Sequence, residues 1–199
     1  RFIQEIYLIL IKIIMNILIT GGAGYIGSHI SYQLMYKGHS LVIIDNLSNS
    51  NISVINKLNK INKNKAIFYE GDICDRNILN EVFTNNNIDL VIHMAGLKSI
   101  SESILHPIKY YKNNVTGTLE LLNAMFENNI YKIIFSSSAT VYGEPHTLPI
   151  KEDHSLSPTN PYGKSKKIVE DILIDLSNSN MNWKIASLRY FNPIGANEN

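Results

Sequence analysis

Cysteine is nearly absent from this sequence, with Cys74 the single example among 199 residues. One thiol excludes an intramolecular disulfide framework and leaves no cysteine cluster for structural zinc. This usage suits a reducing compartment, so we expect a cytoplasmic protein that holds no metal. We interpret Cys74 as a small residue of the interior or its border.

An excess of charge of either sign is also missing. The chain has 18 Lys and Arg against 17 Asp and Glu, a formal net charge of +1. Its basic residues are scattered, apart from short pairs such as Lys166 and Lys167, so no basic face for nucleic acid is expected. We therefore predict that nucleic acid is not a partner.

The apolar run at residues 6–14 is too short to cross a membrane. It is interrupted by Lys12, and a spanning helix needs about 20 apolar residues. It also lacks a small-residue cleavage site, which disfavours a signal peptide. A strand and a glycine-rich turn begin at Met15. We expect residues 1–14 to be an upstream extension, non-native or disordered, and residues 15–199 to form one domain.

The remaining composition, with 45% hydrophobic residues, is sufficient for the core of one domain. Strand-like runs occur at residues 16–20, 41–45, 66–69, 90–94, 133–136 and 185–189. Most are continuously apolar, as strands covered on both faces are, and segments between several of them have helical spacing. This alternation predicts an α/β fold with a doubly wound, Rossmann-like parallel sheet. Gly38 marks one helix end, and Asp75 caps the start of another helix.

A glycine-rich turn follows the first predicted strand and opens a helix. In Gly21-Gly22-Ala23-Gly24-Tyr25-Ile26-Gly27, glycines occupy the first, fourth and seventh positions. Gly21 permits the tight turn, Gly24 lets the backbone approach a pyrophosphate, and Gly27 lets the helix pack closely. Although such spacing alone is weak evidence, its position between a strand and a helix predicts a dinucleotide site.

Polar residues at the ends of later strands fit the same site. Asp45, 18 residues beyond Gly27, could accept hydrogen bonds from adenosine ribose and repel a 2′-phosphate, which favours NAD over NADP. Its alternative role is to cap a turn. Asp72 is placed for the adenine amino group or as a helix cap. Ala95-Gly96 allows close backbone passage beside the cofactor, whereas we interpret His93 as a packed strand residue.

Tyr162 and Lys166 lie four residues apart on a predicted helix, and therefore on one face of it. A free tyrosine has a pKa of about 10, but a neighbouring ammonium group and a positive nicotinamide ring favour the phenolate. Tyr162 is thus a candidate general base, and Lys166 is expected to lower its pKa and orient the nicotinamide ribose. This pair alone is a common feature of exposed helices.

The end of the fifth predicted strand supplies the missing partner. Hydroxyl residues gather there, at the same edge of the sheet, and we choose Ser138 to hydrogen-bond the reacting oxygen. Thr140 is a second hydroxyl for substrate. Ser136 and Ser137 are interpreted as satisfying backbone groups.

Together these motifs resemble the extended short-chain dehydrogenase family, and within it the nucleotide-sugar epimerases. The similarity runs from about residue 15 to residue 199. Besides the glycine turn, it is carried by Gly96-Leu97-Lys98, Tyr110-Tyr111-Lys112-Asn113-Asn114-Val115, residues 136–143, residues 161–166 and Leu188-Arg189-Tyr190-Phe191-Asn192-Pro193.

The resemblance implies interconversion of UDP-glucose and UDP-galactose with tightly held NAD. NAD takes hydride from sugar C4 while Tyr162 removes the O4 proton, and the hydride returns to the other face of the 4-keto sugar. The resemblance also implies a homodimer formed through two helices, which residues 108–126 and 162–176 could supply. The family carries a C-terminal substrate-binding domain that we expect to be absent here.

The family positions assign roles to individual residues. Ser138, Tyr162 and Lys166 carry the chemistry. Cofactor contacts fall on Gly21, Gly24, Tyr25, Ile26, Gly27, Asp45, Asn46, Leu47, Ser48, Asn49, Ser50, Asp72, Ile73, Met94, Ala95, Gly96, Leu97, Lys98, Asn113, Ser138, Tyr162, Lys166 and Phe191. Substrate contacts fall on Lys98, Ser138, Thr140, Tyr162 and Asn192.

Three alternatives compete with this interpretation, and the residues argue against the first. Nucleotide-sugar dehydratases and decarboxylases share the glycine turn and the Tyr-Lys pair, but a dehydratase needs a carboxylic acid and a carboxylate where Ala139 and Thr140 follow Ser138. An epimerase of another UDP-sugar is a second alternative. The third is an NAD-binding fragment without turnover, since a dinucleotide fold need not host catalysis.

Overall fold

Parallel strands form the centre of the protein. The computed structural model describes residues 14–62 and 65–196, so all but one residue of the expected extension lies outside it. Within the described part, one sheet has the order β3-β2-β1-β4-β5-β6, with all neighbours parallel. The strands are β1 (Asn16–Thr20), β2 (Ser40–Asp45), β3 (Ile67–Glu70), β4 (Leu90–His93), β5 (Lys132–Ser138) and β6 (Lys184–Tyr190). The doubly wound sheet is confirmed, and every predicted strand is present.

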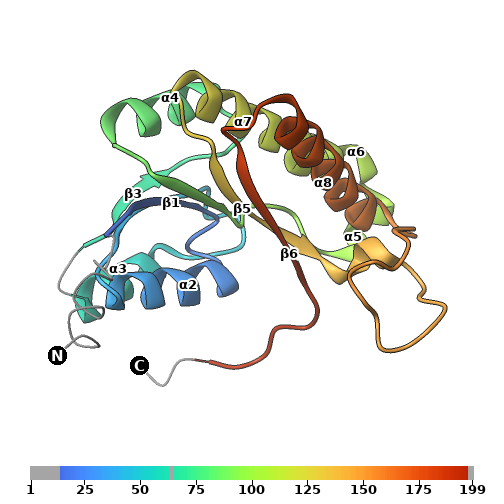
Figure 1. Cartoon of the computed structure of the whole chain (residues 1–199). Helices are drawn as coiled ribbons and strands as arrows, with labels where there is room; N and C mark the ends of the chain where they lie inside the picture. Colours follow the sequence, from blue (N-terminus) through green and yellow to red (C-terminus); the bar gives the residue numbers. More distant parts are fainter. Residues whose placement is uncertain (1–13, 63–64, 197–199) are drawn as a thin grey trace, which may run out of the picture.

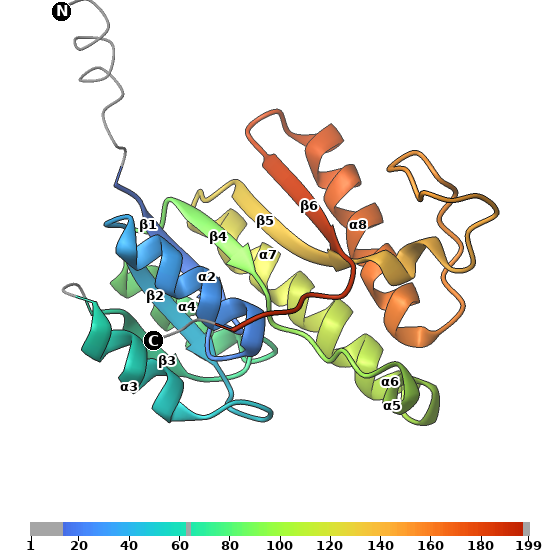
Figure 2. The same ribbon diagram turned by 90° about the horizontal axis from the view of Figure 1, so that it is seen from below.

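Helices cover both faces of this sheet (Figure 1). Helices α2 (Tyr25–Tyr36) and α3 (Ile52–Ile61) lie on one face, nearest the viewer in Figure 2. The opposite face carries α4 (Arg76–Asn85), α7 (Gly117–Glu127) and α8 (Pro161–Ser179). Two short helices, α5 (Ile100–Leu105) and α6 (Pro107–Tyr111), and a π-helical turn, η1 (Lys112–Thr116), lead into α7. A 3₁₀ turn, η2 (Ala139–Tyr142), follows β5.

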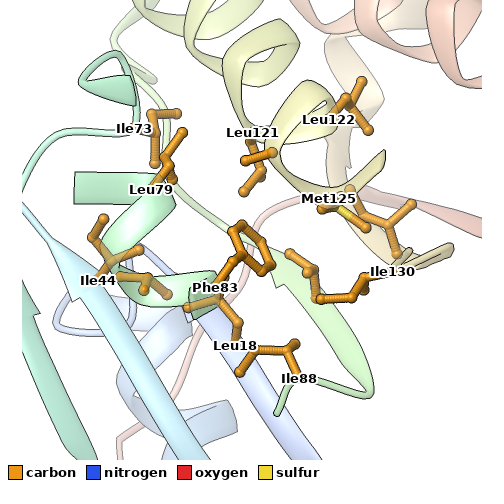
Figure 3. Close-up of a cluster of buried hydrophobic side chains, with 14 of the residues drawn as sticks. Leu18, Ile44, Ile73, Leu79, Phe83, Ile88, Leu121, Leu122, Met125 and Ile130 are labelled. Carbon is orange, nitrogen blue, oxygen red and sulfur yellow. The ribbon is translucent and has the colours of Figure 1, made fainter. Parts of the chain in front are cut away.

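Each central strand contributes alternate side chains to two cores, one on each face of the sheet. In β1, Leu18 faces the core under α4, α7 and α8, whereas Ile17 and Ile19 face the core under α2 and α3. All three are at most 1% exposed. Figure 3 shows the first core, where Phe83 of α4 and Leu121 of α7 converge above the sheet. Burial on both faces explains why the strands are continuously apolar.

Side-chain caps and glycine fix the helix ends that the sequence predicts. The Asp75 carboxylate accepts a hydrogen bond from the N–H of Asn77 at the start of α4. After α2, Gly38 has a φ of 93°, in the left-handed region that favours glycine. Asn160 caps α8 by accepting from the N–H of Gly163. Both predicted boundaries, at Gly38 and Asp75, are confirmed.

The strand order reverses between β1 and β4. Strands β1, β2 and β3 proceed to one side, and β4, β5 and β6 proceed to the other. In open α/β sheets, ligands bind outside the carboxyl ends of the strands at this topological switch point. The ends of β1 and β4 therefore define where a site is expected. Among the residues described, no helix is both long and apolar enough to pass through a membrane.

A pair of leucines on α7 tests the assignment of the core. Leu121 is fully buried, whereas Leu119 is 39% exposed. We expect Leu121→Ala to lower the free energy of unfolding by about 2–5 kcal/mol, because it leaves a cavity, and Leu119→Ala to cost much less. Urea unfolding monitored by circular dichroism measures both changes. Equal losses would contradict this description of the core.

Candidate cofactor and catalytic site

The glycine turn between β1 and α2 allows three backbone segments to approach closely. Gly21 has a φ of 69°, and a Cβ there would lie 2.7 Å from the nitrogen of Ala95 at the end of β4. A Cβ on Gly27 would collide with the carbonyl oxygen of Gly21 and lie 2.9 Å from the Cα of Gly22. These two glycines are therefore required by packing. Gly27 packs against the turn itself rather than the strand.

Gly24 has a different environment. A Cβ there would have one neighbour within 4 Å, the carbonyl oxygen of Gly21 at 3.3 Å. Gly24 is the N-cap residue of α2 and provides no side-chain hydrogen bond, in contrast to the caps of α3, α4, α5 and α8. The first N–H groups of α2 thus lack a side-chain acceptor, which suits a phosphate.

A cavity of about 560 Å³ opens at the carboxyl ends of the strands. Most of the predicted site residues line it, namely Gly21, Gly24, Tyr25, Ile26, Gly27, Asp45, Asn46, Ser48, Asn49, Asp72, Ile73, Met94, Ala95, Gly96, Leu97, Lys98, Asn113, Ser138, Thr140, Tyr162, Lys166, Phe191 and Asn192. The structure therefore brings the glycine turn, the acidic strand ends and the hydroxyl cluster to one place.

Two predicted cofactor contacts do not line the cavity. Leu47 packs against the core under α2 and α3, and the hydroxyl of Ser50 donates to the Asp45 carboxylate at 2.9 Å. The side chains of both residues support the turn, and their contacts with the cofactor stay predictions.

The Asp45 carboxylate at the end of β2 is largely occupied by the protein itself. It accepts hydrogen bonds from the N–H of Ala23 at 3.0 Å, the N–H of Leu47 at 2.9 Å and the hydroxyl of Ser50. The bond to Leu47 holds that residue at a φ of 54°. A carboxylate offers about four acceptor positions, so this turn-forming role is compatible with the predicted contact to ribose.

Asp72 follows the neighbouring strand β3 and also lines the cavity. It accepts from the N–H of Cys74 and from the side-chain amide of Asn46, each at 2.8 Å. Partial burial raises its pKa, but these hydrogen bonds and the charge of Lys112 outweigh burial and lower the pKa below its usual value. Asp75 rather than Asp72 caps α4, so Asp72 remains a charged acceptor beside the cavity.

Ser138 and Thr140 form a hydroxyl pair beside Tyr162. The oxygen of Ser138 accepts from the hydroxyl of Thr140 at 2.9 Å and from its N–H at 3.2 Å. Because both of these are donors, the proton of Ser138 is available to another oxygen. Burial raises the pKa of Tyr162, and a hydrogen bond with Ser138 opposes that rise. Ser138 can therefore donate to an oxygen in the cavity, and its role toward the reacting oxygen stays a prediction.

Lys166 lies one turn along α8 from Tyr162 and is 5% exposed. Its ammonium group donates to the carbonyl oxygen of Ser136 at 2.9 Å and lies 4.8 Å from the centre of the Phe135 ring. Burial lowers the pKa of Lys166 to about 8. The nitrogen is 6.0 Å from the centre of the Tyr162 ring.

The structure corrects the expected effect of Lys166 on Tyr162. We expected the ammonium group to depress the tyrosine pKa, but the pKa of Tyr162 is raised, with burial as the largest cause. The lysine nitrogen donates to the Ser136 carbonyl, and its own charge is weakened by burial. Any lowering of the tyrosine pKa would thus need a positive charge that the chain alone does not supply.

Asn114 is a site residue that sequence reasoning did not single out. It is 3% exposed; its side chain accepts from the N–H of Leu97 at 2.8 Å and donates to the Leu97 carbonyl and the Ser165 hydroxyl. The π-helical turn places Asn113 close to the same N–H, at 3.3 Å. Turns of this kind are frequent at functional sites, and the adjacent pair Asn113-Asn114, in a stretch that carries the family resemblance, was the available signal.

Sequence reasoning also missed an ion pair between α8 and β6, in which the carboxylate is buried. Glu170 of α8 is 3% exposed and binds the guanidinium of Arg189, with Nη2 to Oε2 at 2.8 Å. This ion pair joins α8 to β6, and the Arg189 hydrogen bond to the Tyr142 hydroxyl joins β6 to η2. Ser137 donates to Glu170. The prediction that Ser137 satisfies a backbone group is therefore corrected, because its hydroxyl donates a hydrogen bond to the buried carboxylate of Glu170.

A family model described as the NAD dependent epimerase/dehydratase family matches residues 17–199 of this chain. The chain belongs to that family. Its relatives include the UDP-glucose 4-epimerase of Bacillus subtilis (strain 168), 52% identical over 182 residues, which are 92% of this chain and 54% of the relative. The UDP-glucose 4-epimerase of Dictyostelium discoideum is also 52% identical, over 91% of this chain and 53% of its own length.

The fold agrees with a solved structure of the same kind of protein. UDP-glucose 4-epimerase from Bifidobacterium longum, in complex with NAD+ and UDP, aligns with a TM-score of 0.90 at 47% identity. The alignment covers 92% of this chain and 55% of that one. The chain thus spans about half the length of the curated relatives it matches.

The buried lysine predicts a specific dependence of stability on pH. The pKa of Lys166 is about 8 in the folded protein against 10.5 for a free lysine, so between these values the unfolded state binds more protons. The free energy of unfolding should therefore rise with pH across this window, relative to Lys166→Met, by on the order of 3 kcal/mol.

Urea unfolding at a series of pH values measures this difference. Lys164→Met is the control, because Lys164 is exposed on the same helix. A difference between wild type and Lys166→Met that stayed constant with pH would show that Lys166 titrates as an ordinary lysine.

Proposed function

We propose that this chain is the NAD-binding and catalytic part of a UDP-glucose 4-epimerase, which interconverts UDP-galactose and UDP-glucose. The observation that carries the proposal is the meeting, in one cavity, of the glycine turn, Asp45 and the Ser138, Tyr162 and Lys166 set. The relatives named UDP-glucose 4-epimerase support it over 92% of the chain.

The described residues fit a dinucleotide with two negative phosphates. Gly24 leaves open backbone at an uncapped helix start, and Asp45 and Asp72 offer acceptors on the side of β2 and β3. Lys166 and Tyr162 lie on the side of β5. One dinucleotide can therefore meet phosphate donors near α2, ribose and adenine acceptors beyond β2, and catalytic groups beyond β5.

The segment after β6 passes beside the start of α2 and closes this site on one side (Figure 2). The hydroxyl of Tyr25 donates to the carbonyl oxygen of Gly195 at 2.5 Å. Phe191 and Asn192 of this segment line the cavity. Their position supports the predicted contacts of Phe191 with cofactor and Asn192 with the nucleotide sugar.

The residues divide the proposed reaction between proton transfer and positioning. NAD, when bound, supplies the acceptance and return of hydride at sugar C4. Tyr162 removes and returns the proton of the O4 hydroxyl, and Ser138 donates a hydrogen bond to the reacting oxygen. Lys166 binds the nicotinamide ribose, and the positive nicotinamide ring would supply the charge that favours the phenolate of Tyr162. The raised pKa of Tyr162 means that the free site holds a protonated phenol ready to be activated on cofactor binding.

The assembly and location of the protein belong to this proposal too. A homodimer through α6, α7 and α8 is supported by their exposed apolar side chains, among them Ile108, Phe126 and Ile174, because subunits bury such surfaces. A cytoplasmic location is supported by the single cysteine.

Two glycine variants test the NAD site. Gly24→Ala should keep most of the stability, because its Cβ meets one atom at 3.3 Å, yet weaken NAD binding about tenfold or more by obstructing a phosphate. Gly27→Ala should destabilise the fold itself, because its Cβ would collide with the turn. Calorimetric titration with NAD and thermal unfolding separate the two effects. Unchanged NAD affinity in a folded Gly24→Ala variant would argue against this phosphate site.

A tyrosine variant tests the chemistry. We join the chain to the remaining C-terminal part of the Bacillus subtilis relative and follow UDP-glucose formation from UDP-galactose. Tyr162→Phe should lose turnover by about a hundredfold or more, within the range for a general base, while keeping NAD affinity within about threefold. Tyr36→Phe, on an exposed part of α2, is the matched control. Full turnover in Tyr162→Phe would refute the proposed proton transfer.

A further inference from the structure

A buried imidazole lies behind the cavity wall. His93, the last residue of β4, is 1% exposed. Its Nδ1 is 2.7 Å from the hydroxyl of Thr20, and its Nε2 is 2.8 Å from the hydroxyl of Thr118. Burial and the nearby charge of Lys166 lower the pKa of His93 to about 3. The imidazole is therefore neutral at physiological pH and carries one proton, on either Nδ1 or Nε2.

The neighbouring groups decide which nitrogen carries that proton. Thr118 donates its single hydroxyl proton to the carbonyl oxygen of Asn114, at 2.6 Å. Its oxygen can then only accept from His93, so the proton is on Nε2. Nδ1 is an acceptor as a result, and Thr20 donates to it. The oxygen of Thr20 in turn accepts from the N–H of Ala95 at 3.2 Å.

Both ends of this series of hydrogen bonds return to residues 95–97 of the cavity wall. One end is the N–H of Ala95. At the other end, the Asn114 side chain bonds the N–H and the carbonyl of Leu97, at 2.8 and 2.9 Å. Between them lies Gly96, where a Cβ would be 3.4 Å from the Lys166 nitrogen. A single network thus holds this segment at both ends, beside the catalytic lysine.

We propose that His93 is a positioning residue for the cofactor, which fixes residues 95–97 through its neutral Nε2–H tautomer. His93 does not line the cavity, so it acts through Thr20 and Thr118. A charged imidazole would change the network, because its Nδ1 would carry a proton and the hydroxyl of Thr20 would lose the acceptor of its own proton. The inference rests on the proposed NAD site, because residues 95–97 form part of its wall.

Nitrogen-15 NMR of the histidine side chains of the full chain tests the tautomer directly. Across about pH 5 to pH 8, where histidines ordinarily titrate, we expect His93 to keep the neutral Nε2–H pattern. A histidine that is exposed, such as His146, provides the internal reference. An Nδ1–H tautomer or a charged imidazole at His93 would overturn the proposal.

Paired variants test whether the network positions the wall. Thr118→Val keeps the shape and removes the hydroxyl, whereas Thr118→Ser keeps the hydroxyl. His93→Leu removes both polar nitrogens, whereas the amide of His93→Gln can accept from Thr20 and donate to Thr118. We expect the Kd for NAD to rise about tenfold in Thr118→Val and His93→Leu, and to stay within about threefold in Thr118→Ser and His93→Gln. Amide hydrogen exchange of Leu97 should accelerate in Thr118→Val and His93→Leu but not in the other two variants.

A destabilised variant away from the network separates positioning from general stability. Leu58→Ala, in the core under α3, should lower the Tm without touching His93. If Leu58→Ala weakens NAD binding as much as Thr118→Val at equal loss of Tm, the positioning role is overturned.

If the wild-type chain binds no NAD, the proposed function fails, and hydrogen exchange of the Leu97 amide then tests the inference alone. Faster exchange in Thr118→Val than in Leu58→Ala supports the inference. Equal exchange in the two variants overturns it.

Discussion

The end of β1 and the end of β4 approach so closely that a Cβ on Gly21 would lie 2.7 Å from the amide nitrogen of Ala95. This approach places the glycine turn against the segment that borders Lys166. It also lets the uncapped start of α2 face the same cavity as the hydroxyl cluster after β5. The proposed phosphate binding and proton transfer could share one site because no side chain separates these two backbones.

Two charged residues of α8 lie beside the site that this approach creates. Tyr162, Lys166 and Glu170 follow one another at intervals of four residues, on one face of the helix. Glu170 is bound by Arg189 and Ser137, which leaves the Lys166 ammonium on the carbonyl of Ser136. The Glu170 carboxylate could otherwise neutralise Lys166, but it is bound by Ser137 of β5 and Arg189 of β6. Lys166 therefore has no carboxylate partner on α8, and it lines the cavity.

Much of the fold and the site could be predicted because local chemistry fixed it. The apolar runs, the cap at Asp75 and the glycine turn act over a few residues, and strand ends of a parallel sheet meet at one edge. The contacts that were missed join distant segments. Asn114 contacts Leu97, and Glu170 contacts Arg189. The periodicity of helices and strands does not predict contacts between residues of different elements. The packing of Leu47 and the hydrogen bond from Ser50 to Asp45 could not be predicted either, because the direction of a side chain in a turn depends on the folded backbone.

The sequence by itself determined the class of fold, the glycine turn and the candidate trio of Ser138, Tyr162 and Lys166, because each depends on residue type and spacing along one segment. Only the tertiary structure decided their electrostatics. Burial raises the pKa of Tyr162 and lowers that of Lys166 to about 8. Likewise, the tautomer of His93 follows from two threonines that lie 73 and 25 residues away. A pKa or a tautomer depends on the burial and the hydrogen-bond partners of a group, and these are set only when distant segments of the chain fold together.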